Sequence, residues 1–294
     1  MSGWGRQNSS SVMRRDVLLK ALTHRTPLRS VLARRFIQQF SLFSYEQRLA
    51  IEAVDRPHYG YCIFQAARLA SLLGYSRISA LEFGCGGGNG LLNAEMHIKE
   101  VTKLFFVDID LYGFDAGSGL PAPTDYRDMP HYFRQGLYEM DRGTLERRLK
   151  HAKLVIGEIR DTCGNFLQSY VPAPIGCMLH DLDYYSSTRD ALTLFDGESS
   201  CFLPRVFMYF DDVIGDETWL CNEFTGELLA IDEFNQKHRL KKICKNRIVS
   251  KQFPNSIWPD RIYVYHDFEH ARYNDFVAGE QQLGHQRAIR LKQV

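Results

Sequence analysis

The sequence predicts an α/β fold in which a mostly parallel sheet is covered by helices on both faces. Through the middle of the chain, apolar segments of strand length alternate with segments of helical periodicity, which is typical of that architecture. A glycine-rich turn follows the first expected strand, and acidic residues follow several later strands. Because no linker divides the 294 residues, we expect one domain, residues 45–294, after a basic arm, residues 1–44.

The arm carries most of the asymmetry in charge. Its first 40 residues hold eight Lys and Arg and a single acid, Asp16, so their net charge is +7, while the rest of the chain carries −6. A solvated arm, partly disordered or helical, is the preferred interpretation. An organelle transit peptide and a dock for an acidic partner are the alternatives, and the pattern fits all three.

The composition argues for a globular protein of the cytoplasm. The chain is 45% hydrophobic and 24% charged, with no run of eighteen apolar residues and no signal-peptide pattern. Its seven cysteines are scattered and never form a CxxC pair. That usage fits reduced thiols and argues against a disulfide framework or a cysteine zinc site. We therefore expect a cytoplasmic protein without a membrane partner.

Two helices are expected before the first strand. The first covers residues 45–54 and is interrupted by Arg56 and Pro57. Residues 61–73 then repeat apolar side chains at helical spacing, and Gly74 is a natural stop.

The first strand and the elements after it follow from shorter patterns. The apolar run at residues 78–83 predicts a strand, and residues 90–99 predict the helix that follows the glycine-rich turn. Residues 104–106 and 110–114 both look extended. Residues 117–134 are rich in Pro, Gly and Tyr and predict a surface loop.

The second half continues the alternation of strands and helices. We expect helices at residues 144–151, 187–195 and 223–237, and strands at residues 154–156, 175–179, 206–210, 243–249 and 261–265. The final two strands have no helical pattern between them, so we expect them to pair as an antiparallel hairpin at one edge of the sheet.

The glycine-rich turn, ALEFGCGGGNG, is the first candidate binding site. A dinucleotide fingerprint would need a glycine at the sixth position from Gly84, where the sequence has Asn89. The pattern that fits is acid-x-G-x-G-x-G, formed by Glu82, Gly84, Gly86 and Gly88. Open α/β sheets bind ligands beyond the carboxyl ends of their strands, and a carboxylate there suits a ligand with a cationic centre or an ammonium group.

With this motif the sequence resembles the class I S-adenosylmethionine-dependent methyltransferases. The turn D-x-x-x-G-L-P from Asp115 further resembles the macrocin-type sugar O-methyltransferases. The resemblance implies a Rossmann-like fold, a mostly parallel seven-stranded sheet with an antiparallel edge hairpin. It also implies that the glycine loop, Asn89 included, holds the methionine end of the cofactor and that Asp115 accepts the ribose hydroxyls. Asp108 and Asp110 remain alternatives for the ribose, and Glu158 would flank the adenine.

Two later strand ends carry paired acids. The segment MLHDLDYYSST contains Asp181 and Asp183, and RVFMYFDDVIG contains Asp211 and Asp212. Carboxylates that converge repel one another, and an oxygen-only ligand set favours a hard cation such as Mg²⁺. The resemblance implies that Asp181, Asp211 and Asp212 are the metal ligands. Asp183 could be a ligand, the general base or a helix N-cap, and His180 is a second candidate for the base by its position.

The implied activity is methyl transfer to a hydroxyl of a small molecule or sugar. The aromatic stretch from Tyr126 to Tyr138 would cover the acceptor as a lid, or pack against the N-terminal helix. We expect no nucleic-acid partner, and the resemblance allows a homodimer. The alternatives are another enzyme that binds NAD or a nucleotide sugar, and a non-catalytic Rossmann-like binding module.

Overall fold

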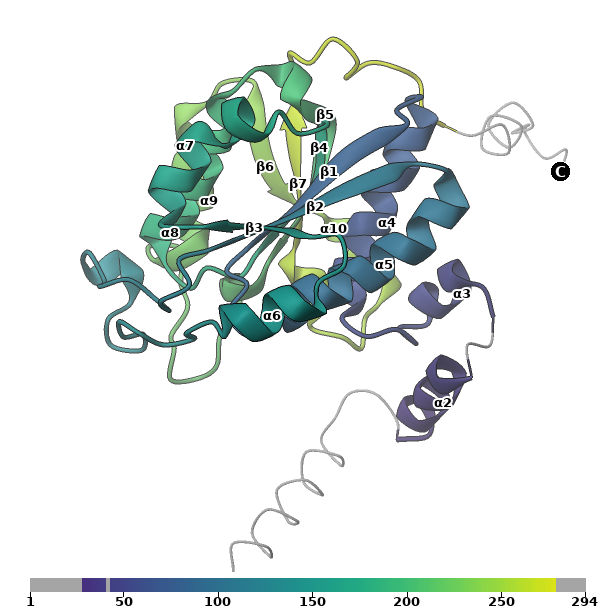
Figure 1. Cartoon of the computed structure of the whole chain (residues 1–294), viewed down its shortest axis with the longest axis horizontal. Helices are drawn as coiled ribbons and strands as arrows, with labels where there is room; N and C mark the ends of the chain where they lie inside the picture. Colours follow the sequence, from purple (N-terminus) through teal and green to yellow (C-terminus); the bar gives the residue numbers. More distant parts are fainter. Residues whose placement is uncertain (1–27, 41–42, 279–294) are drawn as a thin grey trace, which may run out of the picture.

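The computed structural model describes residues 28–40 and 43–278 and shows one sheet between two layers of helices (Figure 1). The sheet has seven strands in the order β3-β2-β1-β4-β5-β7-β6. The strands are β1 (Arg77–Phe83), β2 (Asp108–Asp115), β3 (Lys153–Ile156), β4 (Ile175–His180), β5 (Phe202–Phe210), β6 (Lys241–Lys245) and β7 (Ile262–Asp267). The first five pair in parallel, and β7 is antiparallel to both β5 and β6. The predicted fold class is therefore confirmed.

The helices cover both faces of this sheet. They are α2 (Leu28–Gln39), α3 (Tyr45–Ala50), α4 (Pro57–Leu72), α5 (Asn89–Phe105), α6 (Arg142–Arg148), α7 (Ile159–Tyr170), α8 (Tyr185–Leu192), α9 (Gly226–Lys237) and α10 (Arg247–Gln252). Helices α4 and α5 lie on one face, and α7, α8 and α9 lie on the other (Figure 1). In the described ranges, no helix has both the length and the apolar character needed to cross a membrane.

Two expectations near the first strand were wrong. Pro57 does not interrupt a helix but begins α4 at its first helical position, where its missing N–H costs nothing. The apolar residues 104–106 are not extended, because α5 continues to Phe105 and ends at Phe106 in the left-handed conformation.

Two helices were not predicted. Helix α7 contains glycine and several polar residues of low helix propensity, yet it buries Ile159, Cys163 and Phe166 at helical spacing. Helix α10 lies between β6 and β7, where the sequence predicted one long strand and a direct hairpin. The two strands do pair as expected, but the longer connection lets β7 lie between β5 and β6.

A row of stacked rings crosses the sheet close to its carboxyl edge. Phe114, Phe83, His180 and Phe210 are stacked in this order, and Tyr263 meets Phe210 edge-on at the end of the row. Each ring comes from one of five neighbouring strands. Successive ring centroids lie 4.8, 4.8, 4.5 and 5.3 Å apart, a spacing that favours aromatic pairs. Each pair adds stability beyond its buried area, so the row fixes how these strand ends lie relative to one another.

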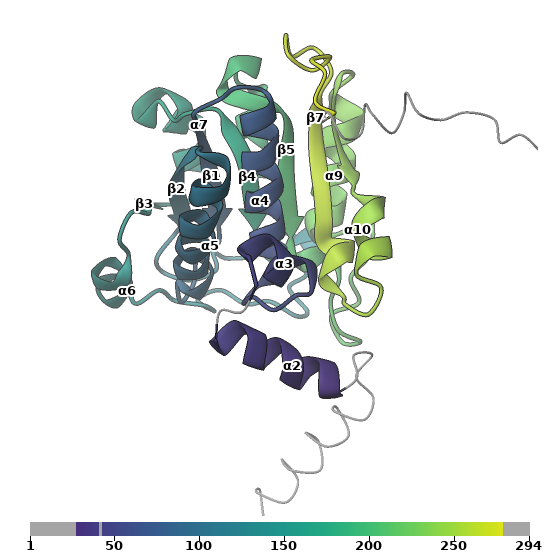
Figure 2. The ribbon, with the colours of Figure 1, turned by 90° about the vertical axis from the view of Figure 1, so that its right-hand side faces the viewer.

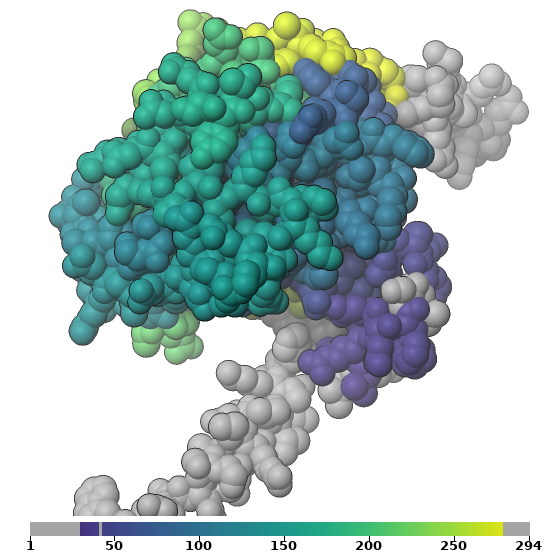
Figure 3. Space-filling model, in the orientation of Figure 1, coloured from purple at the N-terminus to yellow at the C-terminus, as the bar shows by residue number. Residues whose placement is uncertain are grey.

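Helix α2 belongs to the predicted basic arm and lies at the rim of the domain, next to α3 (Figures 2 and 3). The rest of that arm up to residue 27, and residues 41–42, lie outside the described residues, so the arm's division from the domain stays a prediction. Glu52 ties α2 to the domain. Its carboxylate pairs with Arg34 at 2.5 Å, and it accepts the indole N–H of Trp258 at 2.7 Å and the hydroxyl of Ser256.

We expect Glu52→Ala to lower the free energy of unfolding by about 2–4 kcal/mol, because the Trp258 and Ser256 donors lose their charged acceptor. Urea denaturation followed by tryptophan fluorescence measures this loss. Arg34→Ala is the matched control and should cost less than about 1 kcal/mol, since its side chain is 30% exposed. Equal losses in the two variants would show that the contact with Trp258 adds nothing.

Candidate active site

A cavity of about 370 Å³ opens at the carboxyl edge of the sheet, directly above the row of rings. Ten of the residues predicted for the site line it: Glu82, Gly84, Gly86, Asn89, Asp115, Glu158, Asp181, Asp183, Asp211 and Asp212. The structure thus brings the glycine loop and the acidic strand ends together, as predicted. Gly88 and His180 are not among the lining residues.

The glycines of the loop serve different purposes. A Cβ on Gly84 would lie 1.8 Å from the carbonyl oxygen of Asp181, so this glycine is needed for the close approach of two strand ends. Gly88 is the N-cap of α5, and a Cβ there would lie 2.2 Å from a methyl carbon of Leu145. A Cβ on Gly86, by contrast, would meet no atom closer than 3.9 Å. Bare backbone is therefore offered to a ligand at Gly86, while Gly84 and Gly88 serve the packing of the protein.

Glu82 lies deep in the wall of the cavity and is 1% exposed. One carboxylate oxygen, Oε1, accepts the hydroxyl of Tyr59 at 3.0 Å. The other, Oε2, is buried without a partner in the described structure. Burial raises the pKa of Glu82 to about 8, and the Tyr59 hydrogen bond opposes that shift. A cationic group in the cavity would satisfy Oε2 and favour the ionised carboxylate.

Asp115 and Glu158 lie at the ends of the next two strands. The carboxylate of Asp115 accepts the backbone N–H of Gly86 at 2.8 Å and that of Gly117 at 2.6 Å, so it joins two loops around the cavity. Ionised carboxylates have about four acceptor positions, which leaves room for ligand hydroxyls. Glu158 is exposed at the start of α7 and lines the cavity with its neighbour Ile159.

Three aspartates form a cluster with the geometry of a metal site. Asp181, Asp211 and Asp212 each offer one carboxylate oxygen, and these oxygens lie within 4.8 Å of one another. Arg261 donates to Asp211 Oδ1 at 2.5 Å, and the Tyr209 hydroxyl donates to the same oxygen. The three carboxylates fit a hard cation such as Mg²⁺, which takes oxygen ligands.

Asp183 borders this cluster without belonging to it. Its backbone is left-handed, with φ 60°, and its N–H donates to Asp212 Oδ2 at 2.8 Å. Of the three roles left open, the helix cap is wrong, because Tyr184 is the N-cap of α8 and the free N–H of Ser186 in its first turn bonds to Asp128 rather than to Asp183. Burial, then repulsion from Asp181 and Asp211, raises the pKa of Asp183 to about 8.

A further acid that the sequence analysis missed lies beneath the cluster. Glu227, from the first turn of α9, is 0% exposed and accepts the backbone N–H of Asp212 at 2.8 Å. Burial and the charge of Asp212 raise its pKa well above the usual value. Its sequence signal is weak, since a glutamate in the first turn of a helix is usually exposed and only stabilises the dipole.

His180 lies outside the cavity. It is fully buried in the row of rings, stacked on Phe83 and Phe210, and neither ring nitrogen has a partner in the described structure. Burial lowers its pKa to about 3, so it stays neutral. Neighbouring residues of a strand point to opposite faces, and Asp181 is the one that faces the ligand side.

Aromatic side chains form the wall opposite the acids. Tyr132, Phe133 and Tyr138 come from the loop between β2 and α6, and Trp219 comes from the segment after β5. The rings of Tyr132 and Trp219 stack with centroids 5.3 Å apart, and Phe133 contacts Trp219 edge-on at 5.1 Å. Three residues of the stretch expected to form a lid therefore line the cavity, and the lid itself stays a prediction.

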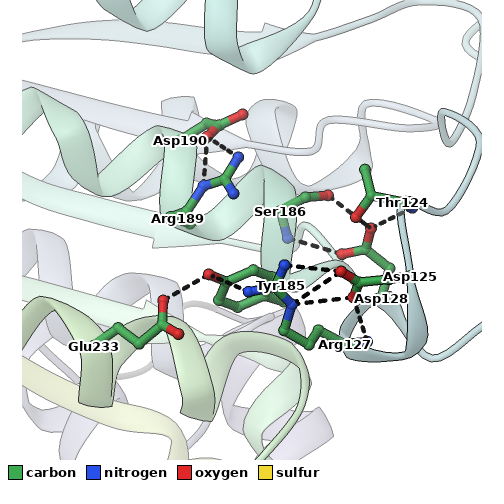
Figure 4. Close-up of polar contacts among 9 residues, drawn as sticks. All are labelled: Thr124, Asp125, Arg127, Asp128, Tyr185, Ser186, Arg189, Asp190 and Glu233. Carbon is green, nitrogen blue, oxygen red and sulfur yellow. Dashed lines mark hydrogen bonds and ion pairs between the residues drawn. The ribbon is translucent and has the colours of Figure 1, made fainter.

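Asp128 holds this loop in place (Figure 4). It is 0% exposed and accepts four hydrogen bonds. Two come from the backbone and hydroxyl of Thr124, at 2.8 and 2.6 Å, and two from the backbone and hydroxyl of Ser186, at 2.8 and 3.0 Å. Because Ser186 lies in the first turn of α8, Asp128 satisfies a free helix N–H from a distant part of the chain. No local pattern signals such a contact.

Tyr185 extends the same attachment to α9 (Figure 4). Its hydroxyl donates to Glu233 at 2.6 Å and accepts from Arg127 at 3.1 Å. The Arg127 guanidinium also lies over the Tyr185 ring, 4.4 Å from its centroid, and pairs with Asp125 at 2.8 Å. Next to it, Arg189 pairs with Asp190 at 2.6 Å. Tyr185 is therefore a structural link between the aromatic loop and the helices α8 and α9.

The sequence matches no protein-family model and no curated protein. Solved structures of similar fold include three methyltransferases. CalS11, a calicheamicin methyltransferase, is 18% identical with a TM-score of 0.46 over 79% of this chain and 90% of that chain. The O-methyltransferase NovP is 18% identical with a TM-score of 0.46 over 72% and 79%. TomG from Streptomyces achromogenes, involved in tomaymycin synthesis, is 14% identical with a TM-score of 0.36 over 91% and 99%. These likenesses concern the fold alone, so the function must be inferred from the site.

We expect Asp128→Asn to lower the free energy of unfolding by about 2–3 kcal/mol, since an amide replaces one acceptor with a donor that faces other donors. Hydrogen exchange measured by mass spectrometry should show lost protection in residues 116–141 before other segments. The control is Glu139→Gln, which changes an exposed acid of the same loop and should leave protection unchanged. Unaltered exchange in the Asp128 variant would contradict the anchoring role.

We expect Mg²⁺ to raise the melting temperature by an amount that depends on pH, because its ligands would be the buried acids of this cluster. Burial and mutual repulsion raise the pKa of Asp181 to about 7 and that of Asp183 to about 8. In the unfolded chain, the pKa of an aspartate is near 4. The raised pKa values of the folded protein therefore stabilise the metal-free fold fully below pH 4, and this stabilisation is lost as the pH rises through 7 to 8. Mg²⁺ needs deprotonated ligands, so the gain in melting temperature on adding it should grow from pH 6 to pH 8.

Thermal unfolding with and without Mg²⁺ measures this gain. Asp181→Asn should abolish it, whereas Asp216→Asn, which changes an aspartate outside the cluster, should keep it. A gain that is independent of pH, or that survives in the Asp181 variant, would be evidence against a metal at these carboxylates.

Proposed function

We propose that this chain is an S-adenosylmethionine-dependent O-methyltransferase that acts on a hydroxyl of a small molecule or sugar, assisted by Mg²⁺. The observation that carries the proposal is that one cavity holds both a glycine loop, beside the buried and unsatisfied Oε2 of Glu82, and a cluster of three aspartates. The glycine loop with Glu82 suits a cationic methyl donor without phosphates, and the aspartate cluster suits a metal that binds an oxygen nucleophile.

The donor would lie along the first strands of the sheet. Glu82 would accept a hydrogen bond from the ammonium group of the methionine moiety, and Gly86 and Asn89 would approach it with little steric hindrance. Asp115 would accept the ribose hydroxyls, and Glu158 would flank the adenine. This order follows the sequence of strand ends across the sheet, since ligands of open α/β sheets bind along that edge.

The acceptor would lie over the later strands. Asp181, Asp211 and Asp212 would hold Mg²⁺, which when bound supplies a Lewis acid that lowers the pKa of a coordinated hydroxyl. Asp183 would remove the acceptor proton, because its raised pKa suits a general base near neutral pH and it lies beside the ligands. His180 has no part in this proposal, since its ring is buried away from the cavity.

The aromatic wall would complete the acceptor site. Its rings, Tyr132, Phe133 and Trp219, would exclude water and orient a ring-shaped acceptor against the metal. Such orientation supplies much of the rate enhancement in displacement reactions. The seven free cysteines support a reducing compartment, so we propose a cytoplasmic enzyme that acts without nucleic acid or a membrane.

Titration calorimetry on the full-length protein, with and without Mg²⁺, tests the donor. We expect S-adenosylmethionine to bind with a Kd in the micromolar range, on the order of −8 kcal/mol, and NAD not to bind. Binding of NAD alone would support the nucleotide-binding alternative.

Absence of binding on folded protein would leave the non-catalytic module as the better account. Glu82→Gln should weaken S-adenosylmethionine by about tenfold, the effect of one charge-assisted hydrogen bond. The control, Glu146→Gln, changes an exposed glutamate of α6 that does not line the cavity, so it should leave the affinity unchanged.

A further inference from the structure

Arg56 lies on the wall of the cavity nearest the glycine loop, together with Glu82 and Asn89. It is the N-cap residue of α4 and is partly exposed. Within residues 28–40 and 43–278, no carboxylate or other acceptor forms an ion pair or hydrogen bond with its guanidinium. The cavity therefore contains a cation that no described residue neutralises by direct contact.

The backbone of Arg56 is strained. Its φ of 43° and ψ of 63° are left-handed, which is rare for a residue with a long side chain and rarer before a proline such as Pro57. The carbonyl of Arg56 accepts the N–H groups of Tyr59 and Gly60 at 3.0 and 3.2 Å. Such strain persists only where surrounding contacts enforce it, and it is concentrated at ligand-binding positions.

Arg56 and Glu82 are held on the same wall by one ring. The Arg56 guanidinium carbon lies 5.3 Å from the centroid of Tyr59, and the Tyr59 hydroxyl donates to Glu82 Oε1 at 3.0 Å. Tyr59 is fully buried, so it fixes both neighbours. The opposite charges are thus close to each other, yet they do not pair.

Among the described residues, neither Arg56 nor Glu82 has an ion-pair partner of the opposite sign. Glu82 Oε2 is buried and unsatisfied, and a buried unpaired acceptor is costly. The guanidinium of Arg56 presents a fork of donors that matches a carboxylate. A ligand that satisfies both carries an ammonium group and a carboxylate a few ångströms apart, which is the zwitterion of an α-amino acid.

We propose that Arg56 binds the α-carboxylate of the methionine moiety of S-adenosylmethionine, while Glu82 binds its ammonium group. This inference rests on the proposed function and assigns a specificity residue to it. Arg56 selects donors that retain the amino-acid carboxylate.

A different role for Arg56 gives a different result. Burial raises the pKa of Glu82 and of Asp181, and the charge of Arg56 opposes both shifts. If Arg56 served only as a counter-ion to these acids, its removal would change the affinity for every donor analogue alike. If it binds a carboxylate, its removal changes only the affinity for analogues that have one.

The experiment compares S-adenosylmethionine with decarboxylated S-adenosylmethionine by titration calorimetry on the full-length protein. The unaltered protein should bind the carboxylate form about 10- to 100-fold more tightly, the factor for one charge-assisted pair. Arg56→Gln should lose most of this preference and should bind the decarboxylated form at least as well as before. Arg56→Lys should keep part of the preference, since it retains the charge without the fork.

Arg148→Gln is the matched control. Arg148 borders a neighbouring hollow together with Arg56 but does not line the cavity, so its removal should leave the preference intact. Circular dichroism and thermal melting establish that each variant is folded, and Arg56→Lys gives the answer should the glutamine variant unfold.

Three results would overturn the inference. A preference that is unchanged in both Arg56 variants would show that this side chain does not contact the carboxylate. An equal loss of affinity for both ligands would show that Arg56 acts as a counter-ion. Failure of the unaltered protein to bind either ligand would overturn the proposed function itself, and this inference with it.

Discussion

The candidate site depends on the stacked rings that join neighbouring strands at the carboxyl edge of the sheet. In four of those strands, the residue that directly follows a ring of the row lines the cavity: Gly84, Asp115, Asp181 or Asp211. Stacking sets the spacing of the strand ends, and the strand ends set the spacing of the ligand-binding groups. An imidazole that is neutral and unpaired is tolerated at His180 because its flat ring continues the stack.

The parts of this site that the sequence could predict are those encoded by adjacent residues. A glycine turn after an apolar run, and acids directly after buried strands, are local patterns, and the parallel topology brings them to one edge. Asp128, Glu227 and Arg56 could not be found in that way. Asp128 and Glu227 accept backbone N–H groups from other segments, and Arg56 shares the cavity wall with Glu82 and Asn89. Each lies in a local context that usually means an exposed cap or loop residue.

The fold shows the same division between local and tertiary information. The strand alternation and most helices follow from periodicity, whereas α7 forms because Ile159 and Phe166 find an apolar surface on the sheet. The last residues of α5 look extended in the sequence because they are apolar, and packing alone decides that the helix continues there. His180 was misplaced for a related reason, since adjacency to Asp181 says nothing about which face a side chain occupies.

The reversed direction of β7 has an electrostatic consequence. Because Ile262 at the start of β7 pairs with Tyr209 near the end of β5, the residue before it, Arg261, arrives beside Asp211. A sheet whose strands all run one way presents only their last residues at its ligand-binding edge. Inverting a single strand places a first residue there, so a positive charge reaches the acids as a direct result of chain direction.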